Sequence, residues 1–261
     1  MWSTLAPFYP RLGHTGMISH STTLGLFARF GVLLLSTSIA FANPPQTFQQ
    51  AKRVAKALFV SHRQTLYCHC QYDEHQQIDL ASCQMQAASI KKRSLRVEFE
   101  HMTPAENFGR QFRCWREPLC TRHGKPYKGR ACCARSDSRF KQAEAELYNL
   151  YPAEGIVNQA RSNYRYGLVD GTDTFYGCAI RIDKATRTAE PDDSVKGLVA
   201  RATLFMSQQY QIKLSKSQRQ LLVAWDRRFP PDVWEKEWAS HIAAIEGYEN
   251  PFITQRLAAN R

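Results

Sequence analysis

The chain lacks an apolar stretch long enough to cross a membrane. Its longest apolar segment, residues 29–42 (RFGVLLLSTSIAFA), is shorter than the roughly 20 residues that a transmembrane helix needs. The segment starts with a basic residue and ends in an Ala-x-Ala pattern at Ala40 and Ala42, which is typical of a secretory signal. We therefore expect residues 1–42 to be removed, and the mature protein to have no stable membrane association. Translation can start at Met1 or at Met17.

Acidic residues are scarce relative to basic ones, with 23 Asp and Glu against 35 Lys and Arg and a net charge of +12. Removal of the signal takes away Arg11 and Arg29 and no acid, which leaves +10 on the mature chain. A charge this positive favours an anionic partner such as nucleic acid, an anionic membrane or an acidic glycan. Internal repeats and low-complexity tracts are also absent from the sequence, and residues 43–261 have an ordinary length for one domain.

Paired C-x2–4-C spacings, the usual pattern of a structural zinc site, are missing. The mature part nevertheless holds eight cysteines: Cys68, Cys70, Cys83, Cys114, Cys120, Cys132, Cys133 and Cys178. An even number of cysteines behind an export signal indicates disulfides, because compartments outside the cytoplasm are oxidising. The competing interpretation is a zinc site built from Cys120, His123, Cys132 and Cys133.

Hydrophobic periodicity predicts an α+β domain with a C-terminal helical layer. Helices are expected over residues 46–63, 136–152, 192–210, 215–229 and 231–248. The helix at 136–152 would be capped by Ser136 or Asp137 and stop at Pro152, and the last helix would begin with Pro231 near its first position. Strands are expected over residues 65–72, 91–101 and 173–183, and residues 104–135 are expected to form a disulfide-held loop.

A glutamate and a histidine, Glu100 and His101, stand side by side where the alternating strand pattern ends shortly before Pro104. A neutral imidazole can take a proton from water near neutral pH. A carboxylate beside it can hold a divalent cation, which would bind a phosphate oxygen. The alternative interpretation is an ordinary pair of surface side chains.

More oxygen ligands for such a cation would come from another element. Glu144 falls on the apolar stripe of the expected helix, one turn before Tyr148, and a carboxylate there needs a partner. Asn158 and Asn163 follow that helix. A salt bridge to a neighbouring arginine is the alternative for Glu144, and a helix cap is the alternative for Asn158.

Basic residues are dense between Lys91 and Arg139, with Phe112, Trp115 and Tyr127 interleaved. They fit a polyanionic substrate better than a neutral one. The alternative is a solvated strand edge whose charges prevent aggregation.

Five blocks of sequence, in order, resemble the bacterial endonuclease I family over residues 65–254. They are EHMTPAENFGRQFRCW, FKQAEAELYNLYPAEGIVNQARSNYRYG, YGCAIRID, EPDDSVKGLVARATLFM and YENPFI. The resemblance implies a periplasmic or secreted, monomeric, single-domain enzyme, braced by disulfides and built on a ββα-metal (His-Me finger) core. It further implies a Mg²⁺-dependent endonuclease that hydrolyses DNA, and RNA as well, without sequence preference and leaves 5′-phosphates. Ca²⁺ and Mn²⁺ are candidate replacements for Mg²⁺.

The resemblance also assigns roles to single residues. His101 would be the general base, Glu100 and Asn158 would bind Mg²⁺ directly, Arg130 would contact the phosphate near the scissile bond, and Glu144 would reach the metal through water or as an outer group. Tyr148 stands where the family often has His, so this position cannot bind the metal in the usual way.

The loop at 116–132 is longer than in the relatives, which leaves the alignment of Arg130 open. It also brings in Cys120 and an extra cysteine of the adjacent pair. Cys68, Cys70, Cys83, Cys114, Cys133 and Cys178 fall at family disulfide positions. We expect the bridges Cys114–Cys133 and Cys120–Cys132, with the reverse pairing open.

Two other functions compete with the nuclease. One is a noncatalytic, disulfide-rich, secreted nucleic-acid-binding protein on the same scaffold, against which the intact Glu100, His101 and Asn158 argue. The other is a periplasmic glycan hydrolase that would use Glu98 and Glu100, which share a strand face. The sequence does not distinguish the periplasm from full secretion, and it identifies neither a physiological substrate nor a preference between DNA and RNA.

Overall fold

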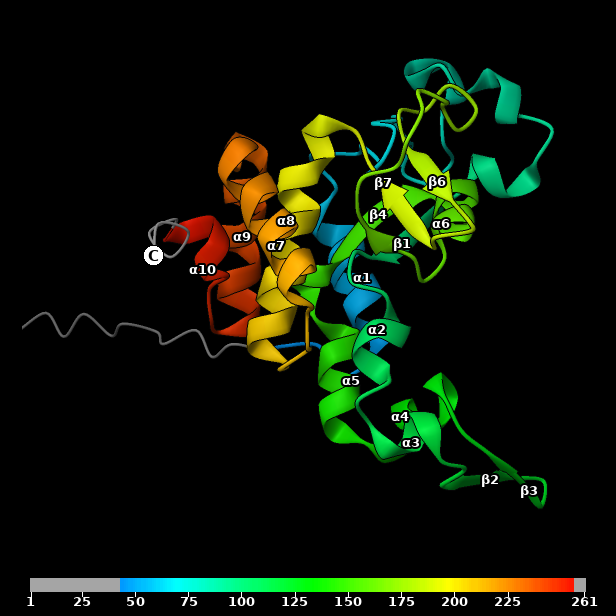
Figure 1. The fold of residues 1–261 in the computed structure, drawn as a ribbon, viewed down its shortest axis with the longest axis vertical. Coiled ribbons are helices and arrows are strands. Elements are labelled where there is room, and N and C mark those ends of the chain that lie inside the picture. Colours follow the sequence, from blue (N-terminus) through cyan, green and yellow to red (C-terminus); the bar gives the residue numbers. More distant parts are fainter. Residues whose placement is uncertain (1–42, 256–261) are drawn as a thin grey trace, which may run out of the picture. The chain divides into compact units, whose positions relative to one another are not determined.

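Two antiparallel strands, β1 (Val97–His101) and β4 (Leu150–Glu154), pair side by side, and Glu100 and His101 are the last two residues of β1. The computed structural model describes residues 43–255, so the expected signal at 1–42 lies outside the described residues. The register pairs Glu100 with Tyr151 and His101 with Leu150. Helix α6 (Gly155–Arg161) follows β4 directly and packs against both strands (Figure 1).

The expected C-terminal helical layer is confirmed. It consists of α7 (Asp193–Gln209), α8 (Lys216–Arg228), α9 (Val233–Glu246) and α10 (Pro251–Thr254), drawn from yellow to red in Figure 1. Asp192, Ser215 and Asp232 cap the first three of these helices with their side-chain oxygens. The prediction that Pro231 begins α9 is wrong, because Asp232 occupies the cap and the helix starts one residue later.

The remaining elements are short apart from α1 (Phe48–Leu58), which is capped by Thr47 and packs on α5 (Ser138–Ala145) and β4. The short helices are η1 (Leu80–Cys83), η2 (Gln86–Ala88), η3 (Lys92–Leu95), α2 (Ala105–Gly109), α3 (Arg113–Arg116), α4 (Arg130–Ser136) and η4 (Leu147–Asn149). Strands β2 (Cys120–Arg122) and β3 (Lys125–Tyr127) form a hairpin, and β5 (Arg165–Tyr166), β7 (Thr188–Glu190) and β6 (Arg181–Asp183) form a three-stranded sheet in that order.

Several expected elements are corrected by the structure. Residues 65–72 form turns and isolated bridges rather than a strand, and residues 104–135 contain three helices and a hairpin rather than a loop. Of the expected strand at 173–183, only Arg181–Asp183 is a strand. The expected helix at 136–152 ends at Ala145, although Asp137 does cap it. Pro152 lies within β4, which a two-stranded sheet tolerates because both of its strands are edges.

All eight cysteines form disulfides, and none is free within the described part of the chain. The bridges are Cys68–Cys178, Cys70–Cys83, Cys114–Cys133 and Cys120–Cys132, so the expected pairing of the last two is confirmed. The zinc interpretation is wrong, because three of its four proposed ligands are cysteines in these bridges. No helix between residues 43 and 255 is long and apolar enough to span a bilayer.

Candidate active site

A cavity of about 930 Å³ opens beside β1, and four of the five candidate residues line it. Glu100 and His101 come from β1, Asn158 from α6 and Arg130 from α4. Glu100, His101 and Asn158 meet because β1, β4 and α6 pack together, although Glu100 and Asn158 are 58 positions apart in the sequence. The fifth candidate, Glu144, lies next to the cavity without lining it.

The His101 ring is held in one orientation. Its Nε2 atom lies 2.8 Å from the backbone carbonyl oxygen of Glu144, and its face stacks on Phe48 with ring centroids 4.7 Å apart. A carbonyl oxygen only accepts hydrogen bonds, so Nε2 carries the proton and the Nδ1 lone pair is left for another proton. Burial, and then the Arg130 cation, lower the pKa of His101 to about 3, so the ring is neutral at pH 7.

The Glu100 carboxylate is almost fully buried, and one of its oxygens is already engaged. Its Oε1 atom accepts hydrogen bonds from the Tyr67 hydroxyl at 2.8 Å and from Arg161 Nη1 at 2.6 Å. Burial raises the pKa of Glu100 to about 6 even though the Arg161 cation opposes the shift. Oε2 has no hydrogen-bond partner among residues 43–255. A second cation at this oxygen would favour the ionised carboxylate.

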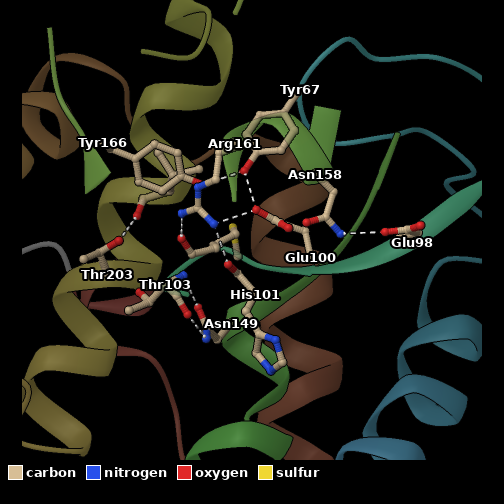
Figure 2. A network of polar contacts seen from close by, with 12 residues as sticks. Tyr67, Glu98, Glu100, His101, Thr103, Asn149, Asn158, Arg161, Tyr166 and Thr203 are labelled. Carbon is tan, nitrogen blue, oxygen red and sulfur yellow. Dashed lines mark hydrogen bonds and ion pairs between the residues drawn. The ribbon is translucent and has the colours of Figure 1, made fainter. Parts of the chain in front are cut away.

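Arg161 is a buried residue of the site that the sequence reasoning missed. It donates to Glu100, to the carbonyl of His101 at 3.0 Å and to the carbonyl of Met102, and it stacks over the Tyr166 ring at 4.5 Å (Figure 2). It therefore ties the end of β1 to the end of α6. Its surroundings in the sequence, QARSN, do not distinguish it from the chain's many surface arginines.

Asn158 offers a free carbonyl oxygen to the cavity. Its Nδ2 atom donates to Glu98 Oε2 at 3.1 Å, which leaves Oδ1 as the available acceptor (Figure 2). The helix-cap alternative is wrong, because Glu154 occupies the cap of α6. Glu98 is also bound by Arg93 at 2.7 Å and by Arg96 at 2.9 Å. Both carboxylate oxygens of Glu98 are therefore already occupied by neighbouring side chains, which argues against the glycan hydrolase.

Glu144 forms an ion pair with Arg130, with Nε and Oε1 2.5 Å apart, so its salt-bridge interpretation is confirmed. The same residue therefore orients two candidates, Arg130 through its carboxylate and His101 through its carbonyl. The role of Glu144 in the reaction stays a prediction.

The prediction that Tyr148 stands one turn above Glu144 is wrong, because α5 ends between them. The Tyr148 hydroxyl instead donates to the carbonyl of Ala239 in the helical layer.

The sequence reasoning also missed one wall of the cavity. Helix α1 lines it with Phe48, Lys52, Arg53 and Lys56, and the Arg130 guanidinium lies 4.9 Å from the centre of the Phe48 ring. The signal for this wall was present in the sequence. Phe48, Lys52 and Lys56 are spaced by four residues, so they share one face of the helix.

The available donors fit a hard divalent cation. No group of three or more His, Cys, Asp or Glu side chains is placed to hold a metal within residues 43–255. Mg²⁺ does not need such a cage, because it usually keeps several waters and takes one or two carboxylates together with substrate phosphate oxygens. The Glu100 carboxylate and the Asn158 amide oxygen, beside a wall of basic side chains, are donors of this kind.

Comparison with known proteins gives consistent matches. The model of the Endonuclease I family matches residues 46–256. The chain is 39% identical to an extracellular deoxyribonuclease of Aeromonas hydrophila, over 81% of this chain and 90% of that protein. It is 36% identical to a periplasmic deoxyribonuclease of the same species, over 90% of this chain and 98% of that protein. It is 33% identical to Endonuclease-1 of Buchnera aphidicola subsp. Acyrthosiphon pisum (strain APS), over 80% of each chain.

Proposed function

Because the chain belongs to the endonuclease I family, we propose that it is a Mg²⁺-dependent endonuclease that hydrolyses phosphodiester bonds inside DNA. The protein is a nuclease of the periplasm or the extracellular space. The observation that carries the proposal is the meeting of Glu100, His101 and Asn158 at one cavity. Glu100 and His101 lie on the first of two antiparallel strands, and Asn158 lies on the helix that follows the second strand. This order supports the assignment of a ββα-metal (His-Me finger) core.

His101 acts as the general base in this proposal. Its Nδ1 atom takes a proton from the attacking water, while Nε2–H stays bonded to the Glu144 carbonyl and keeps the ring in place. Assistance of this kind typically contributes roughly 10²–10⁴-fold to the rate. The pKa of the ring is low in the free protein partly because of Arg130. A phosphate bound at Arg130 would offset that cation and make the imidazole a stronger base.

Glu100 and Asn158 hold the cation through a carboxylate oxygen and an amide oxygen. When bound, Mg²⁺ supplies a positive charge that polarises the phosphate and stabilises the leaving oxygen. Arg130, whose side chain is 45% exposed, contacts the phosphate, and Glu144 positions its guanidinium. Cleavage of the bond between phosphorus and O3′ leaves a 5′-phosphate on one product and a 3′-hydroxyl on the other.

The substrate is DNA, and RNA as well, bound through its backbone. The cavity wall carries Lys52, Arg53, Lys56, Arg93 and Arg96, which attract phosphates of any sequence. Export follows from the expected signal at residues 1–42, and we expect the mature enzyme to act as a monomer.

A plasmid-nicking assay tests the proposal. Protein purified with its disulfides intact should convert supercoiled plasmid to nicked and linear forms with Mg²⁺, and EDTA should stop the reaction. Mn²⁺ or Ca²⁺ added after EDTA would show whether another divalent ion replaces Mg²⁺, and a single-stranded RNA substrate tests the second activity. Salt-sensitive DNA binding without cleavage in any of these ions would identify the noncatalytic nucleic-acid-binding protein instead.

A further inference from the structure

A second cavity of about 520 Å³ adjoins the catalytic one. The two cavities share Pro104, Arg161 and Asn163 in their linings. The walls of the second cavity come from five segments: residues 102–110, residues 161–166 at the end of α6 and in β5, the turn before β7, α7, and residues 212–218 at the start of α8. Its volume lies within the range of about 300–1,000 Å³ that is usual for small-molecule sites.

All the charged side chains that line this cavity are positive. Arg110, Arg165, Arg187 and Lys213 line it together with Arg161, and no Asp or Glu is among the lining residues. Arg110 is paired with Glu106 outside the lining. Arg165 and Lys213 are exposed, and neither has an ion pair within the described part of the chain. Arg187 is also exposed and has no ion pair there, and it donates a hydrogen bond to Asn163 Oδ1 at 2.5 Å. The cavity therefore offers an anion three cations that no carboxylate pairs with.

Two buried polar atoms of the lining residues have no hydrogen-bond partner in the described residues: Thr103 Oγ1 and Arg161 Nε. Thr103 is 3% exposed and Arg161 is 1% exposed. Buried polar atoms nearly always have a partner. Both of these atoms lie beneath the cavity surface, however, so a ligand in the cavity would contact the cations and the apolar wall rather than these atoms. In Figure 2, Thr103, Tyr166 and Thr203 lie on the side of Arg161 away from Asn158 and Glu98.

The same cavity has an apolar wall formed by Met102, Tyr166, Ile212 and Leu214. Met102, Tyr166 and Ile212 are buried, and Leu214 is half-buried. An inorganic anion needs only the cations. A ligand that uses both walls has a negatively charged end and a flat or apolar end, which is the chemistry of a nucleotide.

We infer that this cavity binds one nucleotide of the nucleic-acid strand beside the phosphodiester that is cleaved. Its phosphate lies against Arg165 and Lys213, and its sugar and base lie against the apolar wall. This inference rests on the proposed nuclease function. The continuity of the two cavities favours a nucleotide of the strand over a free one. Arg161 contacts both cavities, so the occupant would lie against the residue that holds Glu100.

Calorimetry with deoxyadenosine 5′-monophosphate on the metal-free protein tests the binding site. The double variant Arg165→Ala/Lys213→Ala should bind this nucleotide about tenfold more weakly than the wild type or worse, because one hydrogen bond to a charged group contributes about a factor of ten. The control Lys184→Ala/Lys236→Ala removes the same charge from exposed positions outside both cavities and should match the wild type. No binding to the wild type, or equal affinities of the two double variants, would overturn the inference.

Kinetics distinguish a strand nucleotide from a free one. The Arg165→Ala/Lys213→Ala variant should raise KM for duplex DNA about tenfold with kcat nearly unchanged. Its hydrolysis of bis(p-nitrophenyl) phosphate should be unchanged, because this small diester occupies the catalytic cavity alone. Weaker nucleotide binding with an unchanged KM for DNA would mean a site for free nucleotides and would overturn the strand assignment. A wild-type protein that binds the nucleotide but cuts no DNA would contradict the nuclease proposal instead.

Discussion

His101 and Glu144 are joined by a 2.8 Å hydrogen bond from the imidazole Nε2 to a backbone carbonyl near the end of α5. The ring is also stacked on Phe48 from α1. The orientation of the proposed base therefore depends on two helices that are distant from β1 in the sequence. Side chains that only support the ring should consequently affect the cleavage rate. Residues that bind the metal should affect Mg²⁺ affinity as well, which separates the two groups.

Replacing the base itself should stop the reaction and leave the metal site intact. His101→Ala should reduce plasmid cleavage by roughly 10²–10⁴-fold, because it removes the proton acceptor. The melting temperature and the Mg²⁺ affinity, measured by calorimetry with a short DNA, should stay close to those of the wild type. Cleavage at the wild-type rate would show that the base assignment is wrong. A large loss of Mg²⁺ affinity would make His101 a ligand.

Shortening the side chain under the base should reduce turnover without removing any reacting group. Phe48→Leu leaves the Nε2 hydrogen bond in place but removes the ring that stacks on His101 and lies against Arg130. We expect kcat to fall about ten- to a hundredfold, since misplacement of a catalytic group by about 1 Å has effects of this size. Leu58→Ala, also a half-buried position of α1, is the control and should keep kcat. Equal kcat values for both variants would exclude a positioning role for Phe48.

Removing the charge of Glu100 should weaken the metal site and the fold together. Glu100→Gln keeps the shape but leaves the buried Arg161 without its counter-charge. Breaking a buried pair costs about 3–5 kcal/mol, and the remaining amide hydrogen bonds make the lower end of this range the expected loss. Mg²⁺ affinity should fall by more than the roughly 10–100-fold that loss of an outer-shell partner costs. Urea unfolding and calorimetry measure the two effects, and an unchanged Mg²⁺ affinity would refute the ligand assignment.

The stability of the helical layer should decrease as the pH rises. Burial, and then the neighbouring Glu146 carboxylate, raise the pKa of Glu246 from 4.5 to about 8. Between about pH 4.5 and pH 8, Glu246 therefore keeps its proton in the folded state and loses it in the unfolded state. This contribution to stability is complete below pH 4.5, declines as the pH rises to about 8 and is absent above it.

Thermal unfolding of Glu246→Gln against the wild type measures this contribution. The amide does not titrate, so the difference in melting temperature between the two proteins should change between pH 5 and pH 8 in favour of the variant. Lys236→Ala, an exposed change on the same helix, should run parallel to the wild type. A difference for Glu246→Gln that stays constant over this range would mean that Glu246 titrates normally in the folded state.

The sequence by itself determined the family, the α+β class, the helical layer and the Glu100–His101 pair at a strand end. These features are local, because periodicity, capping residues and short motifs are legible within one segment. The same local reasoning extended a helix as far as Pro152 and predicted no helices in residues 104–135. It failed there because the β1–β4 pairing and two disulfides decide those segments, and both connect residues far apart in the chain.

Only the tertiary structure decided which side chains surround the candidate cation. Arg161 pairs with Glu100, Glu144 turns its carboxylate to Arg130, and Tyr148 points into the helical layer. None of these choices has a periodic signature, because each depends on which partner a charged or polar group finds when burial removes its water. No linear motif predicts the second cavity either. Its walls come from five separate segments that meet only in the folded chain.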